Sequence, residues 1–306
     1  MEIREIASGL EFPEGPVAMP DGSVIVVEIH RGTLSRVTPE GKIEVIAELG
    51  GGPNGAAIGP DGDVYVCNDG GFIWTTFGDW LIPLDVSTGA SEPPDFTGGW
   101  IEKVNPVTGA VTRLYSECDG HVFRSPNDIV FDSNGGFWFT DLGKTRPRDM
   151  DRGGLYYAQP DGSSVVEAAF GLMGPNGVGL SPDGNTVYVA ESFTGHLVAW
   201  DIEGPGQLGK GAVGHGGRVV AATKGHFDSL AVEEDGNIVV AALPEGLCVI
   251  TPHGAFDYEA FPDPMTTNVC FGGPDRRTAF VTLSASGKLV AADWPRAGLE
   301  LAFGGP

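Results

Sequence analysis

Six polar residues stand at one fixed spacing before six turn residues of this 306-residue chain. Seven positions before the Asp or Asn of each turn the sequence has Glu, Asp or Asn, namely Glu14, Asn54, Asn127, Asn176, Asp228 and Asn268. Carboxylate and amide oxygens are hard ligands that Ca²⁺, Mg²⁺ and Mn²⁺ prefer, and Zn²⁺ and Fe²⁺ accept them where Cys and His do not compete. A cation held in this way can polarise a carbonyl or phosphoryl oxygen, and hydrolysis is its natural use.

The two carboxylates in this set, Glu14 and Asp228, would repel each other across a narrow channel. One of them would be pushed toward its neutral form unless a cation lay between them. A structural interpretation competes, because Asn and Asp side chains often cap backbone groups at turns and strand ends. It accounts well for Asn54 and Asn176, each followed by Gly, but poorly for Glu14. We therefore favour a site in which the six residues ring one mouth of a channel.

The segments that would position these residues repeat a strand, a turn and a second strand. The six segments are FPEGPVAMPDGSVIVVE, GPNGAAIGPDGDVYVCN, SPNDIVFDSNGGFWFTD, GPNGVGLSPDGNTVYVA, HFDSLAVEEDGNIVVAA and TTNVCFGGPDRRTAFVT. Asp-Gly and Asn-Gly between such strands predict two-residue hairpins of the type-I′ class, and the last segment departs from this with Asp275-Arg276. At about 3.3 Å per residue, each polar residue would lie roughly 20 Å from its turn, at the opposite end of the first strand.

Further hairpins such as GTLSRVTPEGKIEVIA follow most of these segments, giving a period of roughly 40 to 50 residues and about four strands per unit. This period predicts an all-β fold, a six-bladed β-propeller with a metal site in its central channel. Either EIREIA near the N-terminus or LELAF near the C-terminus could pair into one blade and close the ring. We expect a single domain over residues 1–306, with loop insertions at about 70–99 and 142–154.

Composition excludes several classes of partner. The formal net charge is -23 and no Lys/Arg cluster offsets it, which argues against nucleic acid. The N-terminus lacks a basic segment followed by an apolar run, and no span approaches the roughly 20 apolar residues that cross a bilayer, so we expect a cytoplasmic protein without a membrane partner. The four cysteines lack CxxC spacing and are expected to be buried free thiols. No GxSxG, HExxH, P-loop or GxGxxG motif offers a rival chemistry.

The chain resembles the senescence marker protein (regucalcin), gluconolactonase and luciferin-regenerating enzyme family of six-bladed propellers, with diisopropyl fluorophosphatase as a more distant relative. The resemblance runs from about residue 11 to residue 289. It rests on PEGP at 13–16, SPND at 125–128, GPNG at 174–177 and FDSLAVEEDGNIVVA at 227–241.

The resemblance implies one divalent metal ion held by Glu14, Asn176 and Asp228, with Asn127 either completing the ligand set or binding substrate. Asn54 and Asn268 share the register and are assigned to substrate binding. It also implies a lactone carbonyl polarised by the metal, with Asp228 as the catalytic base or nucleophile. Calcium is the first candidate for the metal, followed by Mg²⁺, Mn²⁺, Zn²⁺ and Fe²⁺.

The leading functional prediction is therefore a metal-dependent lactonase that opens a small, sugar-derived or related lactone. One alternative is phosphotriester hydrolysis of the diisopropyl fluorophosphatase type with the same metal. The other is a non-catalytic propeller that binds calcium or a partner protein on its rim.

Loops that follow the second strands are expected to surround the site, because those strands end at its face. Insertion 70–99, with Trp74, is a candidate lid, and a packing flap outside the ring is the alternative. In 142–154, Arg146 and Arg148 are substrate-binding candidates, although local Asp partners would also explain them. Three further substrate-binding candidates at ends of second strands are His30, Phe193 and His196.

Overall fold

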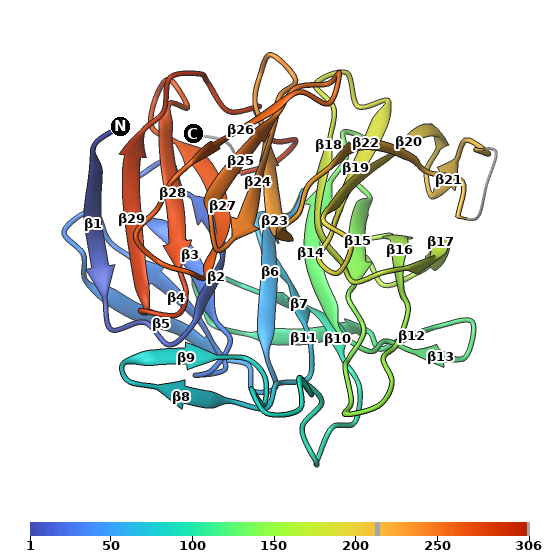
Figure 1. Ribbon diagram of the computed structural model, residues 1–306, viewed down its shortest axis with the longest axis horizontal. Coiled ribbons are helices and arrows are strands. Elements are labelled where there is room, and N and C mark those ends of the chain that lie inside the picture. Colours follow the sequence, from blue (N-terminus) through green and yellow to red (C-terminus); the bar gives the residue numbers. More distant parts are fainter. Residues whose placement is uncertain (212–214, 305–306) are drawn as a thin grey trace.

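Antiparallel sheets arranged around a common centre make up the computed structural model, which describes residues 1–211 and 215–304 (Figure 1). Six of these sheets are the blades of a propeller, which confirms the predicted all-β, six-bladed fold. In the part of the chain that the structure describes, no helix is long and apolar enough to span a membrane.

The first three blades follow the chain in order, each from its inner strand outward. Blade 1 has β2 (Pro13–Ala18), β3 (Val24–Glu28), β4 (Thr33–Val37) and β5 (Ile43–Glu48). Blade 2 has β6 (Pro53–Ile58), β7 (Val64–Asn68), β10 (Trp100–Val104) and β11 (Val111–Tyr115), with the hairpin β8 (Thr75–Phe77) and β9 (Trp80–Ile82) inserted after β7. The hairpin β12 (Glu117–Cys118) and β13 (His121–Val122) leads to blade 3, with β14 (Pro126–Phe131), β15 (Phe137–Asp141), β16 (Gly153–Ala158) and β17 (Val165–Leu172).

The last three blades close the ring through the N-terminus. Blade 4 has β18 (Pro175–Leu180), β19 (Thr186–Glu191), β20 (His196–Gly204) and β22 (Arg218–Ala222), with β21 (Gln207–Leu208) on an extension of β20. Blade 5 has β23 (His226–Val232), β24 (Ile238–Leu243), β25 (Gly246–Ile250) and β26 (Phe256–Glu259). Blade 6 has β27 (Thr266–Gly272), β28 (Thr278–Leu283) and β29 (Lys288–Asp293), and β1 (Ile3–Ser8) is its outer strand. Of the two closures considered, the N-terminal one is present.

The core lies between the blades because each sheet is apolar on both faces. Strands such as β3 and β24 are nearly continuous runs of buried aliphatic residues, so neighbouring sheets must cover both of their faces. Hydrophobic clusters accordingly join each pair of consecutive blades, including blades 6 and 1. This packing around the whole ring fixes the inner strands relative to one another.

The turns between first and second strands differ from the predicted type-I′ class. In blade 1 the Gly22 amide donates to the Met19 carbonyl (3.0 Å), the Met19 amide donates to the Ser23 carbonyl (2.9 Å), and φ is positive at Gly22, 82°, but not at Asp21. A type-I′ turn needs positive φ at both central residues, so the prediction was wrong, and the turn is one residue longer with Gly in the left-handed position. In blade 6, Arg276 takes that position with φ 54°, where Gly would be expected.

Candidate functional site

The six polar residues lie near the start of the six inner strands, where the pairing to the second strand is interrupted. Shifts of register occur at Glu14/Val17, Pro53/Ala56, Pro126/Ile129, Pro175/Val178, Phe227/Leu230 and Thr266/Asn268. Such an irregularity changes the direction of the side chains beside it. Five of the six side chains are buried, and Asp228 retains partial exposure. The constant spacing read from the sequence therefore corresponds to one ring of polar residues at one level of the channel.

Glycines beside the polar residues let the inner strands approach closely. A Cβ on Gly15 would lie 2.5 Å from the carbonyl oxygen of Asn54, and one on Gly55 would lie 2.4 Å from that of Asn127. A Cβ on Gly177 would lie 2.6 Å from a backbone nitrogen of β23. Real Cβ atoms do not approach backbone so closely, so the Gly of PEGP and GPNG is required by the convergence of the strands.

In blades 1 to 4, polar side chains at the ends of the second strands hold the chain just before the inner strand. They accept backbone N–H bonds two or three residues before the ring residue, an arrangement that the sequence analysis did not find. The bonds are Glu11 N to Glu28 Oε2 (2.9 Å), Gly52 N to Asn68 Oδ1 (2.9 Å), Ser125 N to Asp141 Oδ1 (2.6 Å) and Met173 N to Glu191 Oε1 (2.8 Å). In the sequence, the signal for this arrangement was an acidic residue at the end of a second strand, as in VVE, FTD and VAE.

Asn268 has its polar atoms bonded within the protein. Its Nδ2 donates to Glu14 Oε2 (2.7 Å), and its Oδ1 accepts from the Val269 amide (2.8 Å). The amide of Gly15 also donates to Glu14 Oε2 (3.0 Å). Asn268 is thus placed to orient the Glu14 carboxylate.

Asn127 and Asn176 each have a buried Oδ1 with no hydrogen-bond partner among the described residues. In Asn176 the other amide atom is held away from this role, because Nδ2 donates to Ser192 Oγ (3.2 Å), which in turn donates to the Phe227 carbonyl (2.6 Å). An unpaired buried oxygen costs about 1–3 kcal/mol, so two of them in one ring call for a ligand.

Electrostatic repulsion accompanies these unpaired oxygens. Burial raises the pKa of Glu14, although hydrogen bonds from Thr267 and Asn268 oppose the shift. The pKa of Asp228 is raised well above its ordinary value by burial and then by the negative charge of Glu14. A cation between the two carboxylates would offset the repulsion between their negative charges.

Asp128, next to Asn127, is a buried carboxyl that the sequence analysis did not single out. It accepts hydrogen bonds from the amides of Ile129 (2.9 Å) and Val178 (3.2 Å), and so links blade 3 to blade 4. Burial raises its pKa to about 7, although these two amides oppose the shift. Its position directly after Asn127 in SPND was the only available sign.

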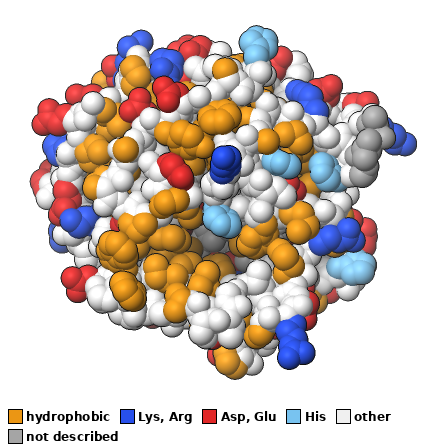
Figure 2. Space-filling model, viewed as in Figure 1, with side chains coloured by type: hydrophobic (Ala, Val, Ile, Leu, Met, Phe, Trp, Pro, Cys, Tyr) orange, Lys and Arg blue, Asp and Glu red, His pale blue; other side chains and the backbone are white. Residues whose placement is uncertain are grey.

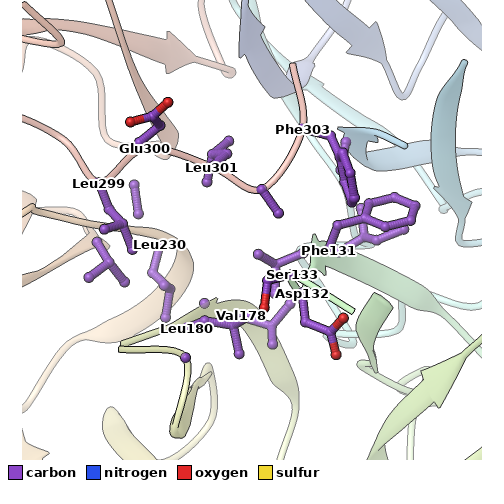
Figure 3. Close-up of a pocket in the computed structure, with 18 of the residues that line it drawn as sticks. Phe131, Asp132, Ser133, Val178, Leu180, Leu230, Leu299, Glu300, Leu301 and Phe303 are labelled. Carbon is purple, nitrogen blue, oxygen red and sulfur yellow. The ribbon is translucent and has the colours of Figure 1, made fainter. Parts of the chain in front are cut away.

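Beyond the ring, Asp128 also lines a cavity of about 530 Å³ that opens toward the turn side of the propeller. Figure 3 shows that the C-terminal segment from Leu299 to Phe303 runs along this cavity, opposite side chains such as Leu230 and Leu180. The labelled side chains are mostly apolar, so this end of the channel offers few ligands for an ion.

Asn54 is connected to the two insertions through a buried ion pair. Its Nδ2 lies 3.4 Å from Asp69 Oδ2, and Asp69 Oδ1 lies 3.4 Å from Lys144 Nζ. Lys144 is buried, donates to the Gly71 carbonyl (2.7 Å) and lies 3.7 Å from the centre of the Phe72 ring. The charge of Lys144 therefore holds loop 142–154 against insertion 70–99. Asp69 was not found from the sequence, because its partner is 75 residues away.

Insertion 70–99 lies on the face that carries the ring. Trp74 packs against Phe12 (5.2 Å between ring centroids) and edge-on to His30 (4.8 Å), and the Leu81 amide donates to the Ala285 carbonyl (3.1 Å). Figure 2 shows a hollow near the middle of this face, with hydrophobic side chains gathered beside it toward the β8–β9 hairpin.

The other candidates for substrate binding differ in how free they are. His30 Nδ1 lies 2.7 Å from Glu11 Oε2. The Arg146 guanidinium pairs with one carboxylate of the other insertion, Glu92, and with two of its own loop, Asp149 and Asp151. Arg148 is exposed. His196 Nδ1 lies 3.9 Å from Glu191 Oε2, and the Phe193 ring is 42% exposed beside the backbone that leads into Asn176.

The residues of the ring fit a divalent cation. Within the described residues, no group of three or more His, Cys, Asp or Glu side chains is arranged to hold a metal ion. The ring instead offers two carboxylates and the two unpaired amide oxygens, which is the hard oxygen set that calcium and magnesium accept.

Comparison with known proteins identifies the family of the chain. The family model described as the SMP-30/gluconolactonase/LRE-like region matches residues 12–285. The chain belongs to this family. Members that resemble it include a gluconolactonase of Zymomonas mobilis, 26% identical over 311 residues (92% of this chain and 79% of the relative). The lactonase drp35 of Staphylococcus haemolyticus is 28% identical over 248 residues, which span 79% of this chain and 66% of the relative.

Solved structures share the fold of this chain. A gluconolactonase from Xanthomonas campestris superposes with a TM-score of 0.74 at 20% identity, over 96% of this chain and 89% of its own. A calcium-binding protein, regucalcin, from Agrobacterium tumefaciens superposes with a TM-score of 0.72 at 19% identity, over 97% and 95%.

Proposed function

We propose that this protein is a divalent-cation-dependent lactonase. The observation that carries the proposal is the pair of unpaired buried oxygens, on Asn127 and Asn176, in a ring that also holds Glu14 and Asp228. Membership of a family whose matching relatives are named gluconolactonase and lactonase supports the reaction class.

Four side chains would hold the cation: Glu14, Asn127, Asn176 and Asp228. We count Asn127 among the ligands, because its Oδ1 lacks a hydrogen-bond partner, as does that of Asn176. Asn268 and Asn54 would support the site without binding the cation, since each donates a hydrogen bond from its side-chain amide to a carboxylate. Calcium is the first candidate, because every ligand is an oxygen atom and a structural relative is described as calcium-binding.

A bound cation would supply positive charge that polarises the lactone carbonyl. Asp228 is the group we assign as general base, because this residue is partly exposed, whereas Glu14 is 2% exposed and already accepts two hydrogen bonds. Asp228 would take a proton from the water that attacks the carbonyl carbon. The ring C–O bond then breaks, and the proton passes to the departing alkoxide to give the hydroxy acid.

The test is turnover of γ- and δ-lactones and aldonolactones by protein that has been stripped with a chelator and reconstituted with Ca²⁺, Mg²⁺, Mn²⁺, Zn²⁺ or Fe²⁺. We expect hydrolysis to vanish on chelation and to return with at least one cation, Ca²⁺ first. Asp228→Asn should be inactive while its far-UV circular dichroism matches the parent protein. Chelator-resistant turnover, or full activity of Asp228→Asn, would overturn the proposal, and hydrolysis of phosphotriesters but not of lactones would replace it with the alternative hydrolase.

A further inference from the structure

Aromatic side chains flank the ring on two sides. On one side Phe12 lies two residues before Glu14, and Trp74 packs against it at 5.2 Å between centroids. Trp74 is only partly buried. On the other side the Phe193 ring is so close to Gly174 that a Cβ there would lie 2.5 Å from it. A molecule bound over the ring would therefore meet aromatic surface at both ends.

Two cations of loop 142–154 are already paired with carboxylates. The Arg146 guanidinium donates to Asp151 Oδ1 (2.7 Å) and Glu92 Oε2 (3.1 Å), and Asp149 is also paired with it. Lys144 is 0% exposed in its side chain and bound to Asp69. These charges hold the two insertions together, so they are unavailable to an anionic substrate. A net charge of -23 and the carboxylates of the ring would also repel such a substrate.

Three candidate hydrogen-bonding groups for a polyhydroxylated substrate are also committed. The amides of Asn268 and Asn54 donate to Glu14 and Asp69, and His30 is bonded to Glu11. A bound hydroxyl that loses water without gaining a partner is penalised, whereas an alkyl group against an aromatic ring is favoured.

We propose that the preferred substrate is an uncharged lactone whose ring carries an apolar substituent, which contacts Trp74 or Phe193. This inference rests on the proposed lactonase function and names its substrate class. Burial of one methylene is worth about 0.8 kcal/mol, so kcat/KM should rise about fourfold for each added carbon until the substituent outgrows the aromatic surface.

The test measures kcat/KM with δ-valerolactone, δ-hexalactone, δ-octalactone and δ-decalactone, with glucono-δ-lactone as the polyhydroxylated comparison and a carboxylate-bearing lactone as the anionic one. We expect the alkyl series to rise with chain length and to exceed both comparison substrates. In Trp74→Ala and Phe193→Ala the ratio of kcat/KM for δ-decalactone to that for δ-valerolactone should fall at least several-fold. Phe77→Ala, at the 73% exposed tip of the β8–β9 hairpin, is the matched control and should keep the ratio.

The outcomes separate this inference from the function on which it rests. If glucono-δ-lactone is hydrolysed faster than every alkyl lactone, the substrate class is wrong and the lactonase function stands. A rising series that is unaffected by both aromatic substitutions would refute the assigned contacts. If no lactone is hydrolysed with any cation, the proposed function and this inference both fail.

Discussion

Neutralising Asp228 should stabilise the ion-free protein and remove its response to calcium. In the ion-free ring the pKa of Asp228 is raised by burial and by Glu14, so its charged form is unfavourable there. Asparagine keeps the shape of the side chain but removes the charge, and therefore removes the repulsion between the two carboxylates. We expect Asp228→Asn to melt at a higher temperature than the parent protein in excess chelator.

The size of the calcium response in the parent protein follows from mass action. A ligand that binds only the folded state stabilises it by about 2.7 kcal/mol at a concentration of 100 times Kd. For a domain of this size one kcal/mol moves Tm by roughly 2 °C, so calcium should raise Tm by roughly 5 °C. Asp228→Asn should lose most of that shift.

Differential scanning calorimetry with chelator and with calcium measures both effects. Asp79→Asn, an exposed carboxylate at the tip of the β8–β9 hairpin, is the matched control and should keep the full calcium shift. The reasoning is refuted if Asp228→Asn retains the calcium shift, or if it melts below the parent protein in chelator.

Three further predictions concern the elements that position the ring. Gly177→Ala should destabilise the fold by about 1–3 kcal/mol in urea denaturation, because the added Cβ would lie 2.6 Å from a backbone atom. Gly204→Ala is the control and should be nearly neutral, because its Cβ would lie 3.8 Å from the nearest atom. Lys144→Met should cost about 3–5 kcal/mol by leaving Asp69 buried without its partner, and the additional change Asp69→Asn should recover part of that loss. Although burial opposes it, hydrogen bonds from two arginines lower the pKa of Asp151 to about 2, so Asp151→Asn should lose about 1–2 kcal/mol at pH 7.

The pH dependence of the last variant has a definite sign. A carboxylate whose pKa is lower in the folded state stabilises the fold above its ordinary pKa of 3.8, and that contribution disappears as pH falls toward 2. The difference between Asp151→Asn and the parent protein in urea denaturation should therefore shrink from pH 4 downward. A difference that stays constant with pH would contradict the role given to Asp151. Equal stability of the two glycine variants would contradict the close approach of the strands at Gly177. A double variant at Lys144 and Asp69 that is no more stable than Lys144→Met would contradict the cost of the unpaired Asp69.

The ring could be predicted from sequence because its spacing is local. Each inner strand has a turn at one end and a polar residue at the other, so a constant offset of seven residues implies a constant height in the channel. The six blades followed from the same repeat. The turn class could not be predicted in this way, because Asp-Gly suits both a type-I′ turn and a longer turn with Gly in the left-handed position.

The partners of individual side chains depend on contacts between distant segments. Arg146 was a candidate for substrate binding, but one of its carboxylates, Glu92, lies 54 residues earlier in the other insertion. Asn268 and Asn127 occupy equivalent positions in the repeat, yet one amide is bonded to Glu14 and the other leaves its oxygen unpaired. Spacing places these residues in the ring, and only the three-dimensional neighbours separate supporting amides from candidate ligands.

The most direct test of the central claim is a crystal structure of the protein grown with Mn²⁺, with anomalous diffraction used to locate the ion. We predict a single peak on the propeller axis, bound by oxygen atoms of Glu14, Asn127, Asn176 and Asp228, and no such peak in crystals of Asp228→Asn. A peak bound elsewhere, or an empty ring at saturating Mn²⁺ and Ca²⁺, would contradict the account.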